Sequence, residues 1–271
     1  MCRFFGLRAT APTSIDCCLV RARNSLMAQS RRDLQGFDNA DGWGIAAWRG
    51  RDLLIQREAN AAHLDDDFRA AAARVEAPTV VAHVRRATVG TIQPVNTHPF
   101  SHGPWAFVHN GTVPYFEQIR EPMLSGMTPL HRAAIRGETD SEHLFHFVLS
   151  RHEQDAARPV LDSLAASLVQ VLRWCREIGD YPRLGLNVLL TDGSRMVGSR
   201  WQRTLCFLER NGRQPCAECG RVHACGDPAG YRALVIASEP TTVEEPWQEV
   251  PERSAFEVGD DLGLRFEPLD P

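Results

Sequence analysis

Short apolar runs rich in β-branched residues recur along the chain, and turn residues bound most of them. Runs of this length and composition are typical of buried strands. Two longer stretches, residues 139–152 and 158–174, instead place Leu, Phe and Val along one helical face. Strands, then a helix pair, then more strands do not fit a repeating βαβ sheet, so this order predicts a layered α+β fold. The runs predicted as strands are residues 78–84, 105–111, 184–192, 204–209 and 231–239.

The length of 271 residues allows one large domain or two small ones. The chain has no internal repeat and no low-complexity linker. The one break in composition is RNGRQPCAECGRVHACGDPAG, residues 210–230, which is rich in Gly, Cys and Arg. We therefore predict a single domain over residues 1–271, with a Cys-rich insertion at about 210–230.

Charge and hydropathy exclude several classes of partner. The net charge is −4 and no basic block is present, so we expect no nucleic-acid partner. No stretch approaches the ~20 apolar residues of a membrane helix, and the first residues turn polar at once, so we expect a water-soluble cytoplasmic protein. All 30 basic residues are Arg, which excludes Schiff-base and P-loop chemistry that depends on Lys.

The stretch HVRRATVG, residues 83–90, follows an apolar run and presents Arg85 and Thr88 at the end of a predicted strand. The planar guanidinium of Arg matches the two oxygens of a carboxylate, so Arg85 is a candidate carboxylate clamp with Thr88 beside it. The alternative interpretation is an exposed Arg pair at a strand-to-loop junction.

The stretch FVHNGTV, residues 107–113, runs from an apolar strand into Asn110 and Gly111. Asn-Gly is a strong hairpin signal, so one interpretation is a simple turn. In the other, the Asn110 side-chain amide and the Gly111 backbone N–H donate to one oxygen and form an oxyanion hole for acyl transfer.

The stretch GETDSEHLF, residues 137–145, has Thr139 and Glu142 at the spacing of a capping box, which predicts a helix start. Asp140 would lie in the first helical turn, where a carboxylate complements the helix dipole. This position explains Asp140 without any function. The alternative is that Asp140 accepts a substrate ammonium group.

Three further features carry little weight alone. NADGWGIAAW, residues 39–48, has two glycines just ahead of an apolar run, which permits close approach of the backbone. NTHPF, residues 96–100, places His98 in a loop before a proline. Cys2 directly follows Met1 and is either an ordinary thiol or a residue that becomes the N-terminus.

Taken together and in this order, Cys2, ADGWG, HVRRATVG, NTHPF, HNG and GETDSE resemble the class II glutamine amidotransferases. The resemblance implies the N-terminal-nucleophile (Ntn) hydrolase fold, a four-layer αββα sandwich. The later segment ASEPTTVEEPWQEVPERSAFEV, residues 237–258, looks like the tail of a stand-alone subgroup. That subgroup includes bacterial predicted amidotransferases and the ergothioneine-pathway γ-glutamyl hydrolase.

The resemblance implies a role for each candidate. Cys2 would be the thiolate nucleophile once Met1 is removed, with its own α-amino group as general base. A pKa of ~7.7–8.0 for the amine and ~8.5 for the thiol permits proton exchange near neutral pH. The other candidates would surround the substrate: Arg85 with Thr88 at the α-carboxylate, Asp140 at the α-ammonium, Asn110 and Gly111 at the oxyanion, and His98 as a further substrate-binding residue.

The sequence departs from the family pattern in two respects. Arg86-Ala87-Thr88-Val89 stands where synthase-fused members commonly carry Trp-Ala-Thr-His, and no synthase domain is found. We therefore favour hydrolysis of a γ-glutamyl amide, glutamine or a conjugate, through a γ-glutamyl thioester. A glutaminase subunit that feeds ammonia to a separate synthase and an inactive scaffold are the alternatives. The expected partner is a small γ-glutamyl molecule, catalysis needs no cofactor, and a synthase partner or a homo-oligomer is left open.

The stretch CAECGRVHAC contains four candidate metal ligands. A C-x2-C pair suits tetrahedral zinc, although the second half of the motif is unusually tight. One interpretation is a structural zinc site, and the other is a flexible loop with free thiols. Cys17, Cys18 and Cys175 are expected to be buried structural thiols. The candidate ligands are Cys216, Cys219, His223 and Cys225.

Overall fold

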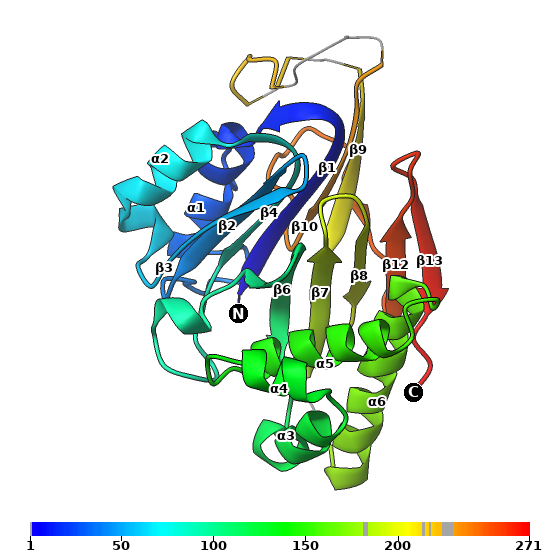
Figure 1. Cartoon of the computed structure of the whole chain (residues 1–271). Helices are drawn as coiled ribbons and strands as arrows, with labels where there is room; N and C mark the ends of the chain where they lie inside the picture. Colours follow the sequence, from blue (N-terminus) through cyan, green and yellow to red (C-terminus); the bar gives the residue numbers. More distant parts are fainter. Residues whose placement is uncertain (1, 181–183, 213–214, 217, 224–229) are drawn as a thin grey trace.

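In the computed structural model, two antiparallel sheets pack face to face and helices cover both outer surfaces (Figure 1). The residues described are 2–180, 184–212, 215–216, 218–223 and 230–271. This is the four-layer αββα arrangement. The β1 strand begins directly after Cys2, which is buried.

The first sheet has seven strands, and β1 lies at its centre between β10 and β4. Every pairing in it is antiparallel. In spatial order the strands are β11 (Gln248–Glu249), β9 (Cys206–Asn211), β10 (Arg232–Ala237), β1 (Arg3–Ser14), β4 (Glu76–Val84), β2 (Trp43–Arg49) and β3 (Asp52–Glu58).

The second sheet has six strands and is also antiparallel throughout. Its strands β7 and β6 are largely buried and face the first sheet. In spatial order the strands are β13 (Leu264–Pro268), β12 (Ser254–Val258), β8 (Met196–Arg200), β7 (Gly185–Thr191), β6 (Trp105–Thr112) and β5 (Phe100–His102).

Three apolar clusters hold the layers together. One lies between the sheets and includes Phe4, Trp48 and Leu189. The second packs α1 (Leu26–Arg31) and α2 (Asp66–Arg74) on the first sheet. The third packs α3 (Phe116–Ser125), α5 (Asp140–Gln154) and α6 (Val160–Ile178) on the second sheet. The other described helix is α4 (Pro129–Ala134), and the short helical turns are Cys17–Arg21, Ala62–Leu64 and Pro94–Asn96.

The predicted helices are α5 and α6, and the five predicted strands are β4, β6, β7, β9 and β10, with ends shifted by a few residues. The turn interpretation of Asn-Gly is wrong. The β6 strand continues through Asn110 and Gly111, which face Asn187 and Leu186 of β7. Backbone pairing with β7 therefore overrides the local turn preference of this dipeptide.

The predicted capping box is half formed. Thr139 caps α5 and accepts a hydrogen bond from the Glu142 N–H at 3.1 Å. The Glu142 carboxylate does not complete the box, because it accepts the backbone N–H groups of Arg136 and Gly137 at 3.0 and 2.7 Å. The Glu142 carboxylate therefore stabilises residues 136–137, which precede the helix, and not the cap residue Thr139.

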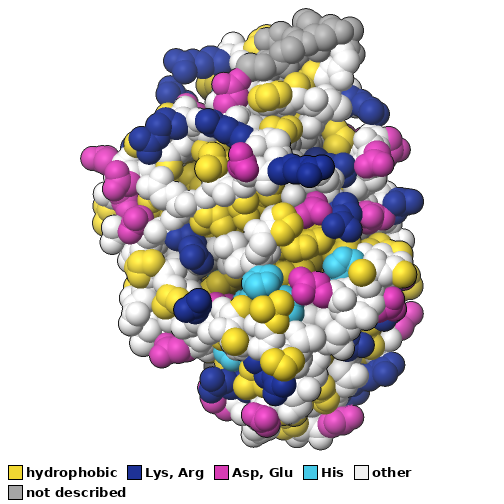
Figure 2. Space-filling model, in the orientation of Figure 1, with side chains coloured by type: hydrophobic (Ala, Val, Ile, Leu, Met, Phe, Trp, Pro, Cys, Tyr) yellow, Lys and Arg dark blue, Asp and Glu magenta, His cyan; other side chains and the backbone are white. Residues whose placement is uncertain are grey.

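The predicted insertion joins the neighbouring strands β9 and β10. On the face drawn in Figure 2, Arg side chains are interspersed with Asp and Glu, as the absence of a basic block predicts. Within the described part of the chain, no helix combines the length and the apolar character needed to cross a membrane.

Candidate active site

Cys2 lies at the start of β1, beside the end of β4. The backbone N–H of Arg86 donates to its Sγ at 3.3 Å, and the thiol lies 3.4 Å from the Arg86 carbonyl oxygen. Burial raises the pKa of the Cys2 thiol, while the Arg86 N–H and the Arg85 cation act to lower it. The nucleophile candidate is thus a buried thiol beside groups that stabilise its anion.

Arg3 anchors the backbone on the other side of Cys2. Its guanidinium donates to the Cys2 carbonyl oxygen at 3.0 Å and forms ion pairs with Asp33 at 2.8 Å and Glu239 at 2.9 Å. All three side chains are almost fully buried. Sequence reasoning missed this network, because its two acids are distant in the chain.

Arg85 is buried close to Cys2, and its side chain is engaged by its own loop. The guanidinium donates to the carbonyl oxygens of Thr91 at 2.9 Å and Val89 at 3.0 Å. Burial lowers the pKa of Arg85, while the neighbouring Cys2, Asp41 and Asp140 act to raise it. Recognition of a carboxylate by Arg85 would therefore involve the 89–91 loop.

The ADGWG and HVRRATVG motifs form one unit. The Arg85 N–H donates to the Gly42 carbonyl at 2.8 Å, and the Asp41 N–H donates to the Arg85 carbonyl at 2.9 Å. The Asp41 carboxylate accepts the Ala87 N–H at 2.8 Å. Gly42 has φ +145°, and a Cβ there would crowd Thr97. The glycine requirement at this position thus comes from the positive φ and from the close approach of the Thr97 side chain and the Glu58 carbonyl oxygen.

Asn110 is fully buried and faces the first sheet. Its Nδ2 donates to Ser238 Oγ at 3.2 Å, and the same Oγ accepts the Phe4 N–H at 3.0 Å. Ser238 therefore links Asn110 in the second sheet to Phe4 in the first sheet, and Phe4 is two residues after Cys2. Sequence reasoning noticed the surrounding ASEP segment but did not single out Ser238.

Gly111 and Thr88 lie next to this link. A Cβ on Gly111 would overlap the carbonyl oxygen of Gly185, so only glycine fits the close approach of β6 and β7. Thr88 is exposed, and its hydroxyl lies 3.3 Å from that of Thr112 at the end of β6. Both residues thus sit at the same end of β6.

Asp140 begins α5 and is buried against the end of β6. Its Oδ2 accepts the Val113 N–H at 2.7 Å, and its Oδ1 accepts the Ser141 N–H at 2.8 Å. Its charge acts on the pKa of both Cys2 and Arg85. The helix-start interpretation and proximity to Cys2 therefore both hold for Asp140.

His98 lies among buried rings. Its ring centroid is 4.2 Å from that of His83 and 4.5 Å from that of Phe100. Burial, together with neighbouring His and Arg charges, holds the pKa of His98 well below its usual value. The contacts described for His98 are those of a neutral packed ring, and none of them is with Cys2.

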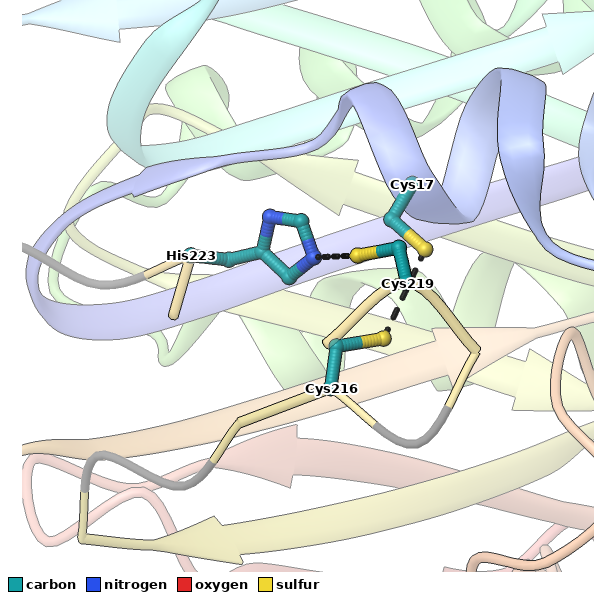
Figure 3. A group of neighbouring side chains, drawn as sticks. All are labelled: Cys17, Cys216, Cys219 and His223. Atoms are coloured by element: carbon teal, nitrogen blue, oxygen red, sulfur yellow. Dashed lines mark hydrogen bonds between the residues drawn. The ribbon is translucent and has the colours of Figure 1, made fainter. Parts of the chain in front are cut away.

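The candidate metal ligands lie apart from Cys2, in the connection between β9 and β10. Cys216, Cys219 and His223 come together, and Cys17 joins them as a residue that sequence reasoning had placed among the structural thiols (Figure 3). The predicted fourth ligand, Cys225, lies outside the described residues.

The structure thus gathers a thiol, a guanidinium, an amide and a carboxylate around the start of β1. These groups match what acyl transfer to a thiol requires: a nucleophile, an oxyanion donor, and charges for a zwitterionic substrate. The members are Cys2, Arg85, Asn110, Gly111 and Asp140, with Thr88 at the edge.

A family model described as class II glutamine amidotransferases matches residues 1–260. Among curated proteins, a γ-glutamyl-hercynylcysteine sulfoxide hydrolase from Mycolicibacterium smegmatis is 30% identical over 266 residues, which covers 96% of each chain. A probable glutamine amidotransferase from Saccharomyces cerevisiae is 26% identical and covers 95% of this chain and 82% of that protein.

Solved structures confirm the fold. A glutamine aminotransferase class-II domain protein from Silicibacter pomeroyi has a TM-score of 0.66 at 20% identity, and the match covers both chains fully. Glutamine phosphoribosylpyrophosphate amidotransferase from B. subtilis has a TM-score of 0.65 at 17% identity, covering 99% of this chain and 49% of that one. The predicted Ntn-hydrolase αββα sandwich is therefore confirmed.

Proposed function

The chain belongs to the class II glutamine amidotransferases, and from that premise we propose that it hydrolyses a γ-glutamyl amide through a thioester on Cys2. The observation that carries the proposal is the setting of the Cys2 thiol. A buried cation, Arg85, and a buried anion, Asp140, both act on its pKa. A cation and an anion flanking a nucleophile are what the α-carboxylate and α-ammonium groups of a γ-glutamyl substrate need.

Removal of Met1 would free the α-amino group of Cys2 to take the thiol proton, directly or through water. The thiolate then attacks the γ-carbonyl carbon, a C–S bond forms, and the carbonyl oxygen becomes negative. When this intermediate collapses, the C–N bond breaks and the leaving amine takes the proton back from the α-ammonium group. Water attacks the thioester by the same route, which releases glutamate and restores the thiol.

Asn110 and Gly111 would stabilise the negative oxygen of the intermediate. A side-chain amide can turn by 180° with little change in shape. In the turned orientation Ser238 donates to the Asn110 Oδ1, an atom without another partner among the described residues. The Nδ2 group is then available to the oxyanion. Ser238 acts here as a positioning residue, since it fixes the amide and not the substrate.

Arg85 would hold the substrate α-carboxylate, with Thr88 at the edge. Its guanidinium donors now go to carbonyl oxygens of the 89–91 loop. A bidentate carboxylate is a stronger acceptor than a pair of neutral carbonyls, so it would replace some of these bonds. Substrate binding would therefore include a local change in this loop.

The substrate class we propose is a γ-glutamyl conjugate in addition to glutamine. Support comes from the relative named as a γ-glutamyl-hercynylcysteine sulfoxide hydrolase, which aligns over nearly the whole of both chains. The leaving group is an amine in either case, and the γ-glutamyl half sets the contacts with Arg85 and Asp140. Hydrolysis then releases glutamate whichever amine departs.

The test is an intact mass spectrum before and after exposure to a diazoketone analogue of glutamine. We expect loss of Met1 and a single adduct that maps to Cys2. Cys175→Ser is the matched control, because Cys175 is buried in α6 against the Pro114 carbonyl and should leave the adduct unchanged. Retained Met1, or no adduct on a free Cys2, would contradict the proposal.

Glutamate release from glutamine and from γ-glutamyl peptides then measures the substrate class. Turnover of a γ-glutamyl peptide by the isolated protein is the expected result. A protein that labels on Cys2 but releases glutamate only when cell extract is added would instead be a glutaminase subunit of a larger assembly.

A further inference from the structure

We propose that Cys17, Cys216, Cys219 and His223 bind one structural Zn²⁺ ion, which fastens the β9–β10 connection to the segment that follows β1. Figure 3 shows the four side chains converging from two parts of the chain. Three ligands come from CAECGRVH, and the fourth comes from the helical turn Cys17–Arg21. The site is independent of the proposed hydrolysis.

The four ligand atoms already have nearly the spacing of a tetrahedral site. The Cys17 and Cys216 Sγ atoms are 3.5 Å apart, and Cys219 Sγ lies 3.0 Å from His223 Nε2. All four atoms lie within 4.8 Å of one another. Tetrahedral zinc with ~2.3 Å bonds to sulfur and ~2.0 Å to nitrogen places sulfurs ~3.8 Å apart and S–N pairs ~3.5 Å apart. Shifts of about 1 Å or less would therefore close the site.

The backbone around Cys216 forms a tight, hydrogen-bonded turn. The Gly220 N–H donates to the Cys216 carbonyl at 2.7 Å, and the Cys216 N–H donates to the Arg221 carbonyl at 2.9 Å. Gly220 has φ +68°, which closes this turn in a conformation that favours glycine. The turn therefore holds the backbone that carries Cys216 and Cys219 in a fixed conformation.

Hydrogen bonds already join the two ligand-bearing segments. The Ser14 N–H, at the end of β1, donates to the His223 carbonyl at 2.8 Å. The Arg23 N–H donates to the Glu218 carboxylate at 3.3 Å. Zinc would thus add metal–ligand bonds between two segments that hydrogen bonds already join.

The ligand set selects the ion and its role. Three thiolates and an imidazole favour zinc over magnesium or calcium, which prefer oxygen ligands. Four protein ligands leave no open position for a substrate, so the site is structural. The 12 residues of β1 lie between this site and Cys2, and at ~3.3 Å per residue the strand spans at most roughly 40 Å.

The test begins with the full chain purified without added metal and analysed by mass spectrometry for bound elements. We expect one zinc per chain, and in cobalt-substituted protein the visible absorption of thiolate-bound tetrahedral Co²⁺. Cys17→Ser and Cys216→Ser should each lose the stoichiometric zinc. The matched control is Cys18→Ser, since Cys18 is buried next to Cys17 but is not among the four ligands.

Cys225→Ser distinguishes this site from the ligand set that the sequence predicts. Zinc retained in Cys225→Ser and lost in Cys17→Ser supports the four ligands proposed here. The reverse result, a Cys17–Cys216 disulfide in alkylated protein, or wild-type protein that neither contains nor takes up zinc would overturn the proposal.

Should Cys17→Ser fail to fold, the wild-type protein still provides a test. Treatment with a strong chelator should remove the ion and increase protease cleavage between β9 and β10, and added zinc should restore resistance. Protease resistance that does not respond to chelator and zinc would contradict the structural role. Labelling of Cys2 by the diazoketone analogue should be the same in both forms, which separates this test from that of the hydrolase.

Discussion

Cys2 and Cys17 lie beyond opposite ends of the same strand, β1, and meet opposite surroundings. Around Cys2 are a backbone N–H, the Arg85 cation and the Asp140 anion. Around Cys17 are two more thiols and an imidazole. The first setting leaves a thiol free to form a bond with carbon, whereas the second suits a thiol bound to a metal.

Electrostatics sharpen the difference. Burial raises the pKa of both thiols. At Cys2 the neighbouring N–H and the Arg85 charge oppose this effect, but at Cys17 the thiols of Cys216 and Cys18 reinforce it. Removal of Met1, as proposed, would therefore leave an amine able to activate Cys2, while a bound cation would stabilise several thiolates around Cys17. Neighbouring groups, and not burial alone, thus decide what a cysteine can do.

The largest expected effect separates the two sites directly. Cys2→Ser should lower kcat for glutamate release by at least about 10³-fold, because the weaker nucleophile must form the ester. The variant should keep the thermal midpoint and the zinc content of the wild type. Turnover, the melting temperature and the metal content are measured on the same preparation. Loss of zinc or unfolding in Cys2→Ser would show that the two ends of β1 are not independent.

The next effect concerns the buried ion pairs of Arg3, beside Cys2. Arg3→Met would leave Asp33 and Glu239 as neighbouring buried carboxylates, so we expect a loss of about 3–5 kcal/mol in the free energy of unfolding. Urea denaturation measures it. The control is Arg265→Met. Arg265 forms an ion pair with Glu257, but its side chain is 73% exposed, so its loss should lower the free energy of unfolding by no more than about 1 kcal/mol. Equal losses in the two variants would refute the anchoring role.

Asn110→Ala tests whether the amide at the end of β6 serves the reaction. We expect kcat to fall about 10²–10³-fold, the usual cost of losing one oxyanion donor, with KM much less affected. Ser238→Ala should give a smaller fall in kcat, since Ser238 bonds the amide and the Phe4 N–H and would not donate to the oxyanion itself. A change confined to KM in Asn110→Ala would show that the amide binds substrate and does not stabilise the oxyanion.

The smallest effect is a dependence of the free energy of unfolding on pH, which we expect from the buried His83. Burial lowers the pKa of His83 to about 3, against about 6.5 in an unfolded chain. Because the unfolded state binds the proton more readily, this stability is present above pH ~6.5 and is lost as the pH falls toward ~3.

For His83 alone the loss at about pH 4.5 is about 2–3 kcal/mol relative to neutral pH. Urea unfolding at the two pH values measures it, and His83→Gln should show a shallower loss on acidification than the wild type. An unchanged slope in His83→Gln would show that other groups account for the acid sensitivity.

The local positions of several residues around Cys2 could be predicted from the sequence, while their roles stay predictions. Arg85, Asn110 and Asp140 stand in short motifs at the ends of an apolar strand or a capped helix, and each local pattern implies its own position. The α+β order followed from the same local periodicities. The family resemblance then implied how these positions meet around Cys2.

The sequence did not reveal the contacts that join distant segments. Cys17 and Cys216 are separated by 199 positions, and Arg3 and Glu239 by 236, so no local spacing links them. The strand state of Asn110-Gly111 was also decided by pairing with β7, against a strong local turn preference. Local chemistry thus determined which residues of this protein are candidates. The tertiary structure decided which of them share a site, because the pairing of β1 with β10 brings Cys17 to Cys216 and Arg3 to Glu239.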